Sequence, residues 1–231
     1  MANDAKKIRF APNGNLFMAP APGTSGATTV LPTDVGDGKA APAGYRGMGY
    51  VDEGGVTITP SIETQPVNVW QSAVPVLYNV QAAAFQVKAT LVEFNQLTTE
   101  LFFGAKWVAV KDDKNQDTGT YRLDLSSTPE LSELSLVVDW AQKGVLYRVV
   151  IPRAMVSDRG AITLQRAEAG KFELTIDALD SDGTLGYVLT NDDILGLGVN
   201  PPVSVPDTGT DTGTGSNPGT GTGTETGTET V

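Results

Sequence analysis

Apolar residues alternate with polar residues in several short stretches of the chain, which is the two-residue period of half-buried β-strands. The clearest example is FQVKATL at residues 85–91, where every second residue is apolar. In GVTITP, Val56 and Ile58 alternate with threonines in the same way until Pro60. The pattern therefore predicts strands over both stretches, each with one face toward a core.

Turn residues between alternating stretches predict three β-hairpins. Asn-Gly and Asp-Gly pairs supply the positive φ angles that tight hairpin turns need. The predicted turns and their flanking strands are Asn13-Gly14 between 8–10 and 16–18, Gln142-Lys143-Gly144 between 134–138 and 145–151, and Asp182-Gly183 between 172–176 and 185–189.

A single short helix is predicted after residue 91. Asn95 can cap its start, Leu97 and Leu101 lie one turn apart, and Gly104 suits its end. Residues from about 20 to 49 are rich in Gly, Pro, Ala and Thr and predict a long N-terminal loop. Together these features predict a mainly β protein, a β-sandwich or barrel with one short flanking α-helix.

The composition changes after Pro206. The following residues are mostly Gly and Thr with a few acids, and they contain no apolar side chain before Val231. Such a segment cannot bury enough surface to offset the entropy of ordering. We predict one domain over residues 1–205 and a disordered, acidic Gly/Thr-rich tail over residues 206–231. A solvated appendage is the favoured interpretation of this tail, and a specific recognition tag is the alternative.

Composition removes much chemistry. Cysteine and histidine are both absent, so the chain has no disulfide, no Cys/His zinc site and no Ser-His-Asp triad. The formal net charge is −11, yet all 16 Lys and Arg residues lie at or before Lys171. Binding of nucleic acid needs a basic face, which this balance argues against, although DNA could pass nearby without adhering.

The N-terminal residues and the apolar runs predict neither a signal peptide nor a membrane span. The first residues, MANDAKKIRFAPNGN, lack the apolar core of a signal peptide. No apolar run approaches the ~20 residues that span a bilayer. We therefore expect a protein made in a reducing cytoplasm without a membrane anchor.

Candidate catalytic and metal motifs are weak. Asp177, Asp180 and Asp182-Gly183 do not match the EF-hand spacing, so we favour a turn over a cation site. Residues 111–117 have mixed charge and indicate solvated surface. The two Gly-x-Gly pairs, at residues 47–49 and 196–198, do not complete a dinucleotide fingerprint. We expect no enzymatic activity, no cofactor and no metal.

The segment from Gly55 to Val76 offers three hypotheses: a catalytic loop, a ligand-binding loop, or a surface covered by another copy. Glu63 has no evident partner to set its pKa for catalysis. Trp70 could be a core aromatic, but Pro66 and Pro75 bracket it, and proline is confined to sheet edges and bulges. An exposed edge is commonly completed by another chain. We therefore predict a subunit interface formed by Val56, Ile58, Pro60, Ile62, Glu63, Gln65, Val67, Trp70 and Gln71.

The run GYRGMGYVDEGGVTITP at residues 44–60 resembles the start of phage major tail proteins. It is more closely similar to the tail tube proteins of long, non-contractile phages that infect actinobacteria. The likeness extends over roughly residues 8–195, through PSIET at 60–64, Trp70-Gln71, residues 85–91 and Glu93-Phe94-Asn95. Some relatives add an immunoglobulin-like domain, in whose place this chain has only the Gly/Thr tail.

The resemblance implies a β-sandwich tube domain, six copies of which form a ring around one continuous inner β-barrel. Stacked rings would form the tail tube, through which the genome passes into the host without specific binding. By the same analogy, Gly55–Gln71 would lie at the ring or stacking interface. The 20–49 loop would contact a neighbouring ring, and Asn95–Gly104 would be the outer helix. Tape measure, tail terminator and baseplate proteins would be partners, and the mature protein would reside in the virion tail.

Two other functions remain open from the sequence. A secreted or cell-surface carbohydrate-binding β-sandwich is the alternative of another class, although the chain shows neither a signal peptide nor a tryptophan-lined platform. A tube protein of a contractile injection device would have the same fold. Only the family resemblance separates it from the tail tube protein of a non-contractile tail.

Overall fold

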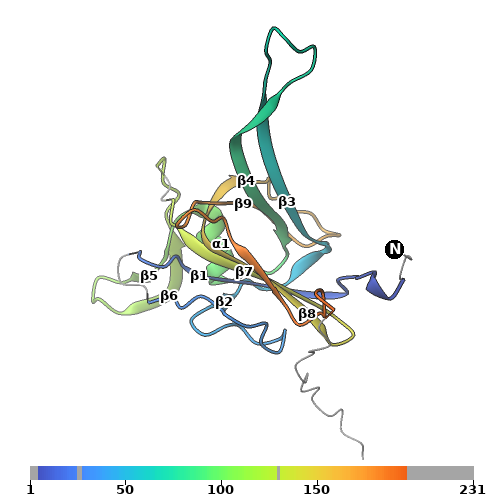
Figure 1. Ribbon diagram of the computed structural model, residues 1–231. Helices are drawn as coiled ribbons and strands as arrows, with labels where there is room; N and C mark the ends of the chain where they lie inside the picture. The colour runs from blue at the N-terminus through green and yellow to red at the C-terminus, as the bar shows by residue number, and fades with distance from the viewer. Residues whose placement is uncertain (1–4, 25–27, 129–130, 197–231) are drawn as a thin grey trace, which may run out of the picture.

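The computed structural model describes residues 5–24, 28–128 and 131–196 and shows a mainly β protein (Figure 1). The elements are a 3-10 turn (Ala5–Lys7), β1 (Asn13–Pro20), β2 (Arg46–Gly47), β3 (Val51–Val67), β4 (Leu77–Leu91), α1 (Gln96–Phe103), β5 (Trp107–Lys111), β6 (Asp117–Leu123), β7 (Leu134–Gln142), β8 (Val145–Arg159), β9 (Phe172–Ala178) and β10 (Tyr187–Thr190).

Most strands belong to one antiparallel sheet with the order β2-β1-β7-β8-β9-β4-β3, and β10 pairs with β8 beside this path. Strand β8 is long enough to pair with two strands in series. Residues 147–150 pair with β10, and residues 154–159 pair with β9. Pro152, which has no backbone N–H to donate, lies between the two paired segments. The part of the sheet that contains β1 and β7 and the part that contains β4 and β9 pack face to face around the main core. This arrangement is the predicted β-sandwich.

The main core lies between strands β1, β7 and β8 on one side and β4 and β9 on the other. Its fully buried side chains include Leu136 and Ile151 from one side and Val87 and Ile176 from the other. A second, smaller core covers the opposite face of β1, β7 and β8. Because successive residues of a strand point to opposite faces, β7 supplies Leu136 to the first core and Val137 to the second.

The predicted helix is confirmed together with both of its caps. The Asn95 side chain accepts a hydrogen bond from the Thr98 N–H at 2.8 Å. Gly104 ends the helix in the left-handed conformation (φ 65°) and donates its N–H to the Glu100 carbonyl. The ring of Phe102 packs edge-on to Phe172 at 5.3 Å, which places the helix at one end of the main core.

The predicted hairpin at Asn13-Gly14 is wrong. These residues begin β1 and pair in register with Trp140 and Ala141 of β7. Glycine fits here for a reason other than a turn, since a Cβ at Gly14 would lie 3.0 Å from the Asp139 carbonyl oxygen. Residues 8–10 instead run on beside the end of β7, where the Phe10 N–H donates to the Gln142 side chain at 2.7 Å.

The two remaining turns are present, but only one of them joins paired strands. Lys143 and Gly144 both have positive φ and close the β7–β8 hairpin as predicted. Asp182 and Gly183 also form a tight turn, bridged between Ser181 and Thr184. The strands on either side of that turn do not pair with each other, however, because β9 and β10 bind to different parts of β8.

The long loop over residues 20–49 is largely confirmed, with β2 interrupting it near its end. The loop lies on the second core and is held there by specific bonds. The Tyr187 hydroxyl donates to the Pro32 carbonyl at 2.7 Å, and Arg148 donates to the Asp34 carbonyl at 3.0 Å. The predicted domain boundary at residue 205 and the predicted tail over 206–231 lie outside the described residues and stay predictions.

Candidate assembly interface

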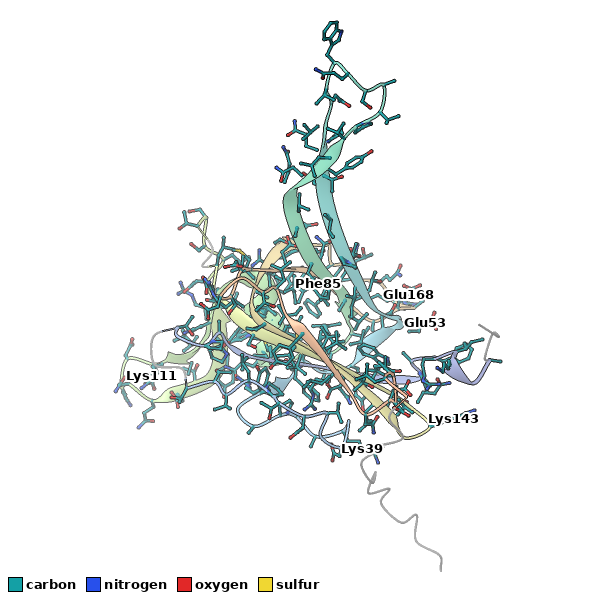
Figure 2. All side chains as sticks on the ribbon, viewed as in Figure 1. Lys39, Glu53, Phe85, Lys111, Lys143 and Glu168 are labelled. Atoms are coloured by element: carbon teal, nitrogen blue, oxygen red, sulfur yellow. The ribbon has the colours of Figure 1, made fainter. Side chains whose placement is uncertain are left out.

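Strands β3 and β4 continue as a two-stranded arm far beyond the body of the protein (Figures 1 and 2). The pairing of β4 with β9 ends at Gln86 and Asp177. Beyond that point β3 and β4 pair only with each other, from Pro60–Phe85 to Val67–Leu77, and residues 68–76 close the tip. We call residues 60–85 the arm. Phe85 marks its base in Figure 2.

The base of the arm is fastened to the body by polar contacts. Lys88 of β4 pairs with Glu173 of β9 at 2.5 Å, and Lys171 pairs with Asp52 of β3 at 3.1 Å. The neighbouring carboxylates, chiefly through these hydrogen bonds, raise the pKa of both lysines above the ordinary value. The Gln86 amide also donates to Asp177 at 2.9 Å. These bonds fix the direction in which the arm leaves the sheet.

One face of the arm is apolar and continues the face that the body strands turn toward the main core. Val56 and Ile58 pack against that core, and the next residues on their face are exposed. Cross-strand partners share a face. By register, the apolar face of the arm consists of Pro60 and Phe85, Ile62 and Ala83, Thr64 and Val80, and Pro66 and Tyr78.

The opposite face of the arm is polar in its middle. Glu63 and Gln65 lie on it, and the Gln81 side chain donates a hydrogen bond to Gln65. Gln81 is the extra residue of a β-bulge, because Glu63 pairs with Ala82 and Thr64 pairs with Val80. The arm therefore has one apolar face and one face that is polar in its middle, and beyond Phe85, which packs partly against the main core, neither face is covered by this chain.

Large apolar side chains are exposed along the whole arm and at its tip. Trp70 is 98% exposed, so the hypothesis that it is a core aromatic is wrong. Residues 64–87 contain no charged side chain. The exposed large apolar residues of the arm are Ile62, Val67, Val69, Trp70, Val74, Val76, Leu77, Tyr78 and Val80. Contiguous exposed apolar surface of this kind marks a binding surface.

The predicted interface residues fall in two places. Val56 and Ile58 lie at the base of the arm, partly buried against this chain's own core. The other seven predicted residues occupy exposed positions on the arm or its tip: Pro60, Ile62, Glu63, Gln65, Val67, Trp70 and Gln71. Strand β3 is also the last strand of the sheet, in agreement with the edge position inferred from its prolines. Whether these residues form a subunit interface stays a prediction.

The β4 side of the arm was not among the residues predicted from the sequence. Tyr78 and Val80 lie on the apolar face, and Val76 and Leu77 lie near the tip, yet none was among the predicted residues. The signal that could have found them is the uncharged stretch from Thr64 to Val87, which is unusual for an exposed segment. Exposed strands normally carry charges that prevent edge-to-edge association.

The acidic motif and the charged loop take the structural roles expected for them. Asp182 lies in the turn before β10, and the Asp177 carboxylate accepts the Gln86 amide. In the loop between β5 and β6, Asp112 accepts hydrogen bonds from the N–H groups of Lys114 and Gln116. Within residues 5–24, 28–128 and 131–196, no cluster of three or more acidic side chains is arranged to hold a metal ion.

The single α-helix of the described chain has eight residues, and no helix there has the length and apolar character needed to cross a bilayer.

Comparison with known protein families places this architecture in a defined class. The chain matches the phage tail tube protein family over residues 1–201. It therefore belongs to that family, and its role is structural, as a component of the phage tail tube. No curated protein matches the chain. The finer likeness to tube proteins of actinobacterial phages stays a prediction.

Proposed function

We propose that this chain assembles into hexameric rings that stack into the tail tube, the conduit for the ejected genome. The observation that carries the proposal is the arm: a long hairpin, charged only at Glu63, that presents an apolar face and an apolar tip to solvent. An isolated two-stranded hairpin is at best marginally stable in water. The arm therefore needs a partner, and membership of the tail tube family supports another copy of the chain as that partner.

The size of the arm agrees with such a role. A stable protein–protein contact involves about 20–30 residues on each side and buries about 800 Å² per partner. The arm spans residues 60–85, so it supplies one such side without help from the body. The free edge of β3 supplies unpaired backbone groups in addition, which a neighbouring strand can complete.

We further propose that the surface lining the lumen is net acidic. Through residue 171 the chain has almost equal numbers of acids and bases, and its further acids follow that position. A basic lumen would bind phosphate groups and slow the passage of DNA. A ring structure whose inner wall carries more Lys and Arg than Asp and Glu would contradict this part of the proposal.

The remaining partners follow from the proposed role. Tape measure, tail terminator and baseplate proteins would contact the ends or the interior of the tube. Genomic DNA would pass through without specific binding. Assembly would take place in the host cytoplasm, and the finished protein would be part of the virion tail. Because the chain belongs to the tail tube family, we favour this function over a carbohydrate-binding module.

Negative-stain electron microscopy of the purified chain at high concentration tests the proposal. We expect rings, stacked rings or tubes. In a parallel experiment, Trp70→Ala should impair tube formation while leaving the thermal stability of the monomer unchanged, since Trp70 is 98% exposed. Trp107→Phe, which changes the tryptophan that donates to Thr99 of α1, is a matched control outside the arm. Persistent monomers of the wild-type chain under every condition would contradict the proposed function.

A further inference from the structure

A groove of about 720 Å³ opens beside the base of the arm, between β1, β3 and β7. Tyr50, Val56 and Ile58 line it from the β3 side, and Val138 and Trp140 line it from β7. Its size lies in the range of sites that bind apolar groups, about 300–1,000 Å³. The groove meets the apolar face of the arm at Ile58, which lies two residues before Pro60 on the same face.

Two of the three acidic residues that line this groove are paired with cations of the same chain. Asp139 forms a buried ion pair with Arg148 at 2.6 Å, and Asp52 pairs with Lys171. Glu53 is exposed at the rim of the groove and lies near Lys171. Asp52 has the largest effect in raising the pKa of Lys171, and the charge of Glu53 adds a smaller one. A cationic ligand would therefore gain little here. An uncharged apolar insert with a hydrogen-bond donor matches the groove better.

The arm tip has this chemistry. It is uncharged, and Trp70 is the most exposed of its large apolar side chains. An indole buries about 150–250 Å² and has a single N–H donor, which usually finds an acceptor when it is buried. The groove offers two aromatic side chains, Tyr50 and Trp140, and carboxylate oxygens at its rim.

The tip cannot reach the groove of its own chain. Val56 lies at the groove, and the extended strand from it to Val67 holds the tip roughly 36 Å away, at about 3.3 Å per residue. The register from Pro60–Phe85 to Val67–Leu77 leaves no reversal that would fold the tip back. An insert from this tip must therefore come from a second copy of the chain.

We propose that the groove between β1, β3 and β7 receives the arm tip of a second copy, with the Trp70 side chain against Tyr50 and Trp140. This inference rests on the proposed self-assembly and identifies the surface that the arm binds. Tip and groove are different surfaces, so the contact is heterologous and can repeat without closing on itself. Successive copies joined in this way would be displaced along the arm by its length, about 36 Å.

Disulfide trapping tests the contact directly, because the chain has no cysteine of its own. Gln71→Cys places a thiol at the tip next to an intact Trp70, and Glu53→Cys places one at the groove rim. A chain with both substitutions, concentrated and mildly oxidised, should give a ladder of linked dimers, trimers and higher species. The matched control combines Gln71→Cys with Val108→Cys, an exposed position on β5, and should give no ladder.

The outcomes separate this inference from the proposed function. Tubes that form without a ladder from the tip–groove pair would overturn the inference and leave the tube proposal standing. Dimers from Gln71→Cys alone, without longer species from the pair, would indicate contact between two tips and would also overturn it. Absence of rings and tubes from the wild-type chain would refute the proposed function itself.

A second measurement needs no substitution and so does not depend on the folding of a variant. Hydroxyl-radical footprinting of the wild-type chain reports the accessibility of aromatic side chains before and after assembly. We expect Trp70 and Tyr50, both largely exposed in the monomer, to become protected together. Protection of Trp70 with Tyr50 unchanged would place the tip elsewhere and overturn the inference.

Discussion

Strand β7 and the arm are both antiparallel β-structure, yet their surroundings are opposite. Residues 134–139 of β7 are buried in succession, because the main core covers one face of the strand and the second core covers the other. Residues 60–67 of β3 and 77–84 of β4 are exposed in succession, although many of them are just as apolar.

This difference shows where the stabilising contacts of each region come from. Backbone pairing already differs, because β7 pairs with β1 and β8, whereas each strand of the arm pairs only with the other. The β7 side chains are removed from water by their own chain, which is the dominant favourable contribution to folding. The arm gains no such burial within the monomer. Its apolar face would be stabilised only by contact with another copy.

The largest expected effect on the monomer is at the buried ion pair of β7 and β8. Asp139 and Arg148 are bonded through two hydrogen bonds, at 2.8 and 2.6 Å, and both side chains are buried. Asp139→Ala would remove the buried partner of the guanidinium and leave only the exposed Asp34 carboxylate, at 3.8 Å, to pair with it, and breaking a buried pair costs about 3–5 kcal/mol. Denaturant unfolding should show this loss. Asp113→Ala in the solvated β5–β6 loop is the control, and a similar loss there would contradict the distinction.

A paired truncation of apolar residues compares the two regions directly. Leu136→Ala in β7 removes a fully buried side chain and should lower the free energy of unfolding by about 2–5 kcal/mol. Ile62→Ala on the arm removes a side chain that is 68% exposed, so the change should stay within about 0.5 kcal/mol. Equal losses in the isolated monomer would show that the arm is packed against its own body.

Acidification should have a smaller effect, and one contribution to it comes from Asp192, which follows β10. Asp192 accepts hydrogen bonds from the Tyr147 hydroxyl and the Arg9 guanidinium, which lower its pKa below the ordinary value. Because the folded-state pKa is the lower one, the stabilisation is complete above the unfolded pKa of about 3.9 and is lost as pH falls through the folded value. Unfolding measured from pH 6 downward should show this slope, and Asp192→Asn should reduce it.

The local patterns that were predicted correctly are those in which neighbouring residues decide the structure. The Asn95 side chain caps the start of the helix, and the Gly104 backbone N–H caps its end. Lys143-Gly144 closes the turn between β7 and β8, which pair from one end of β7 to the other. The strand at residues 85–91 has a two-residue period because one of its faces lies on the core. Each of these signals is contained in a short segment.

The errors arose where distant residues decide. Asn13-Gly14 is a good turn sequence, but the free edge of β7 binds it as a strand instead. The turn at Asp182-Gly183 is present, but β8 is long enough to pair with β9 and β10 in series. The arm was recognised as an edge from its prolines, whereas its second strand and its common apolar face depend on the register between β3 and β4. A single strand does not reveal that register.

Amide hydrogen exchange, compared between the monomer and the assembled tube, tests most directly the claim that the arm is completed by another copy. In the monomer, amides of residues 60–85 should exchange much faster than those of β7, since a hairpin without packed faces opens locally at little cost. In the tube, the account predicts strong protection of the arm and little change in β7. An arm already protected in the monomer, or one that stays unprotected in the tube, would contradict it.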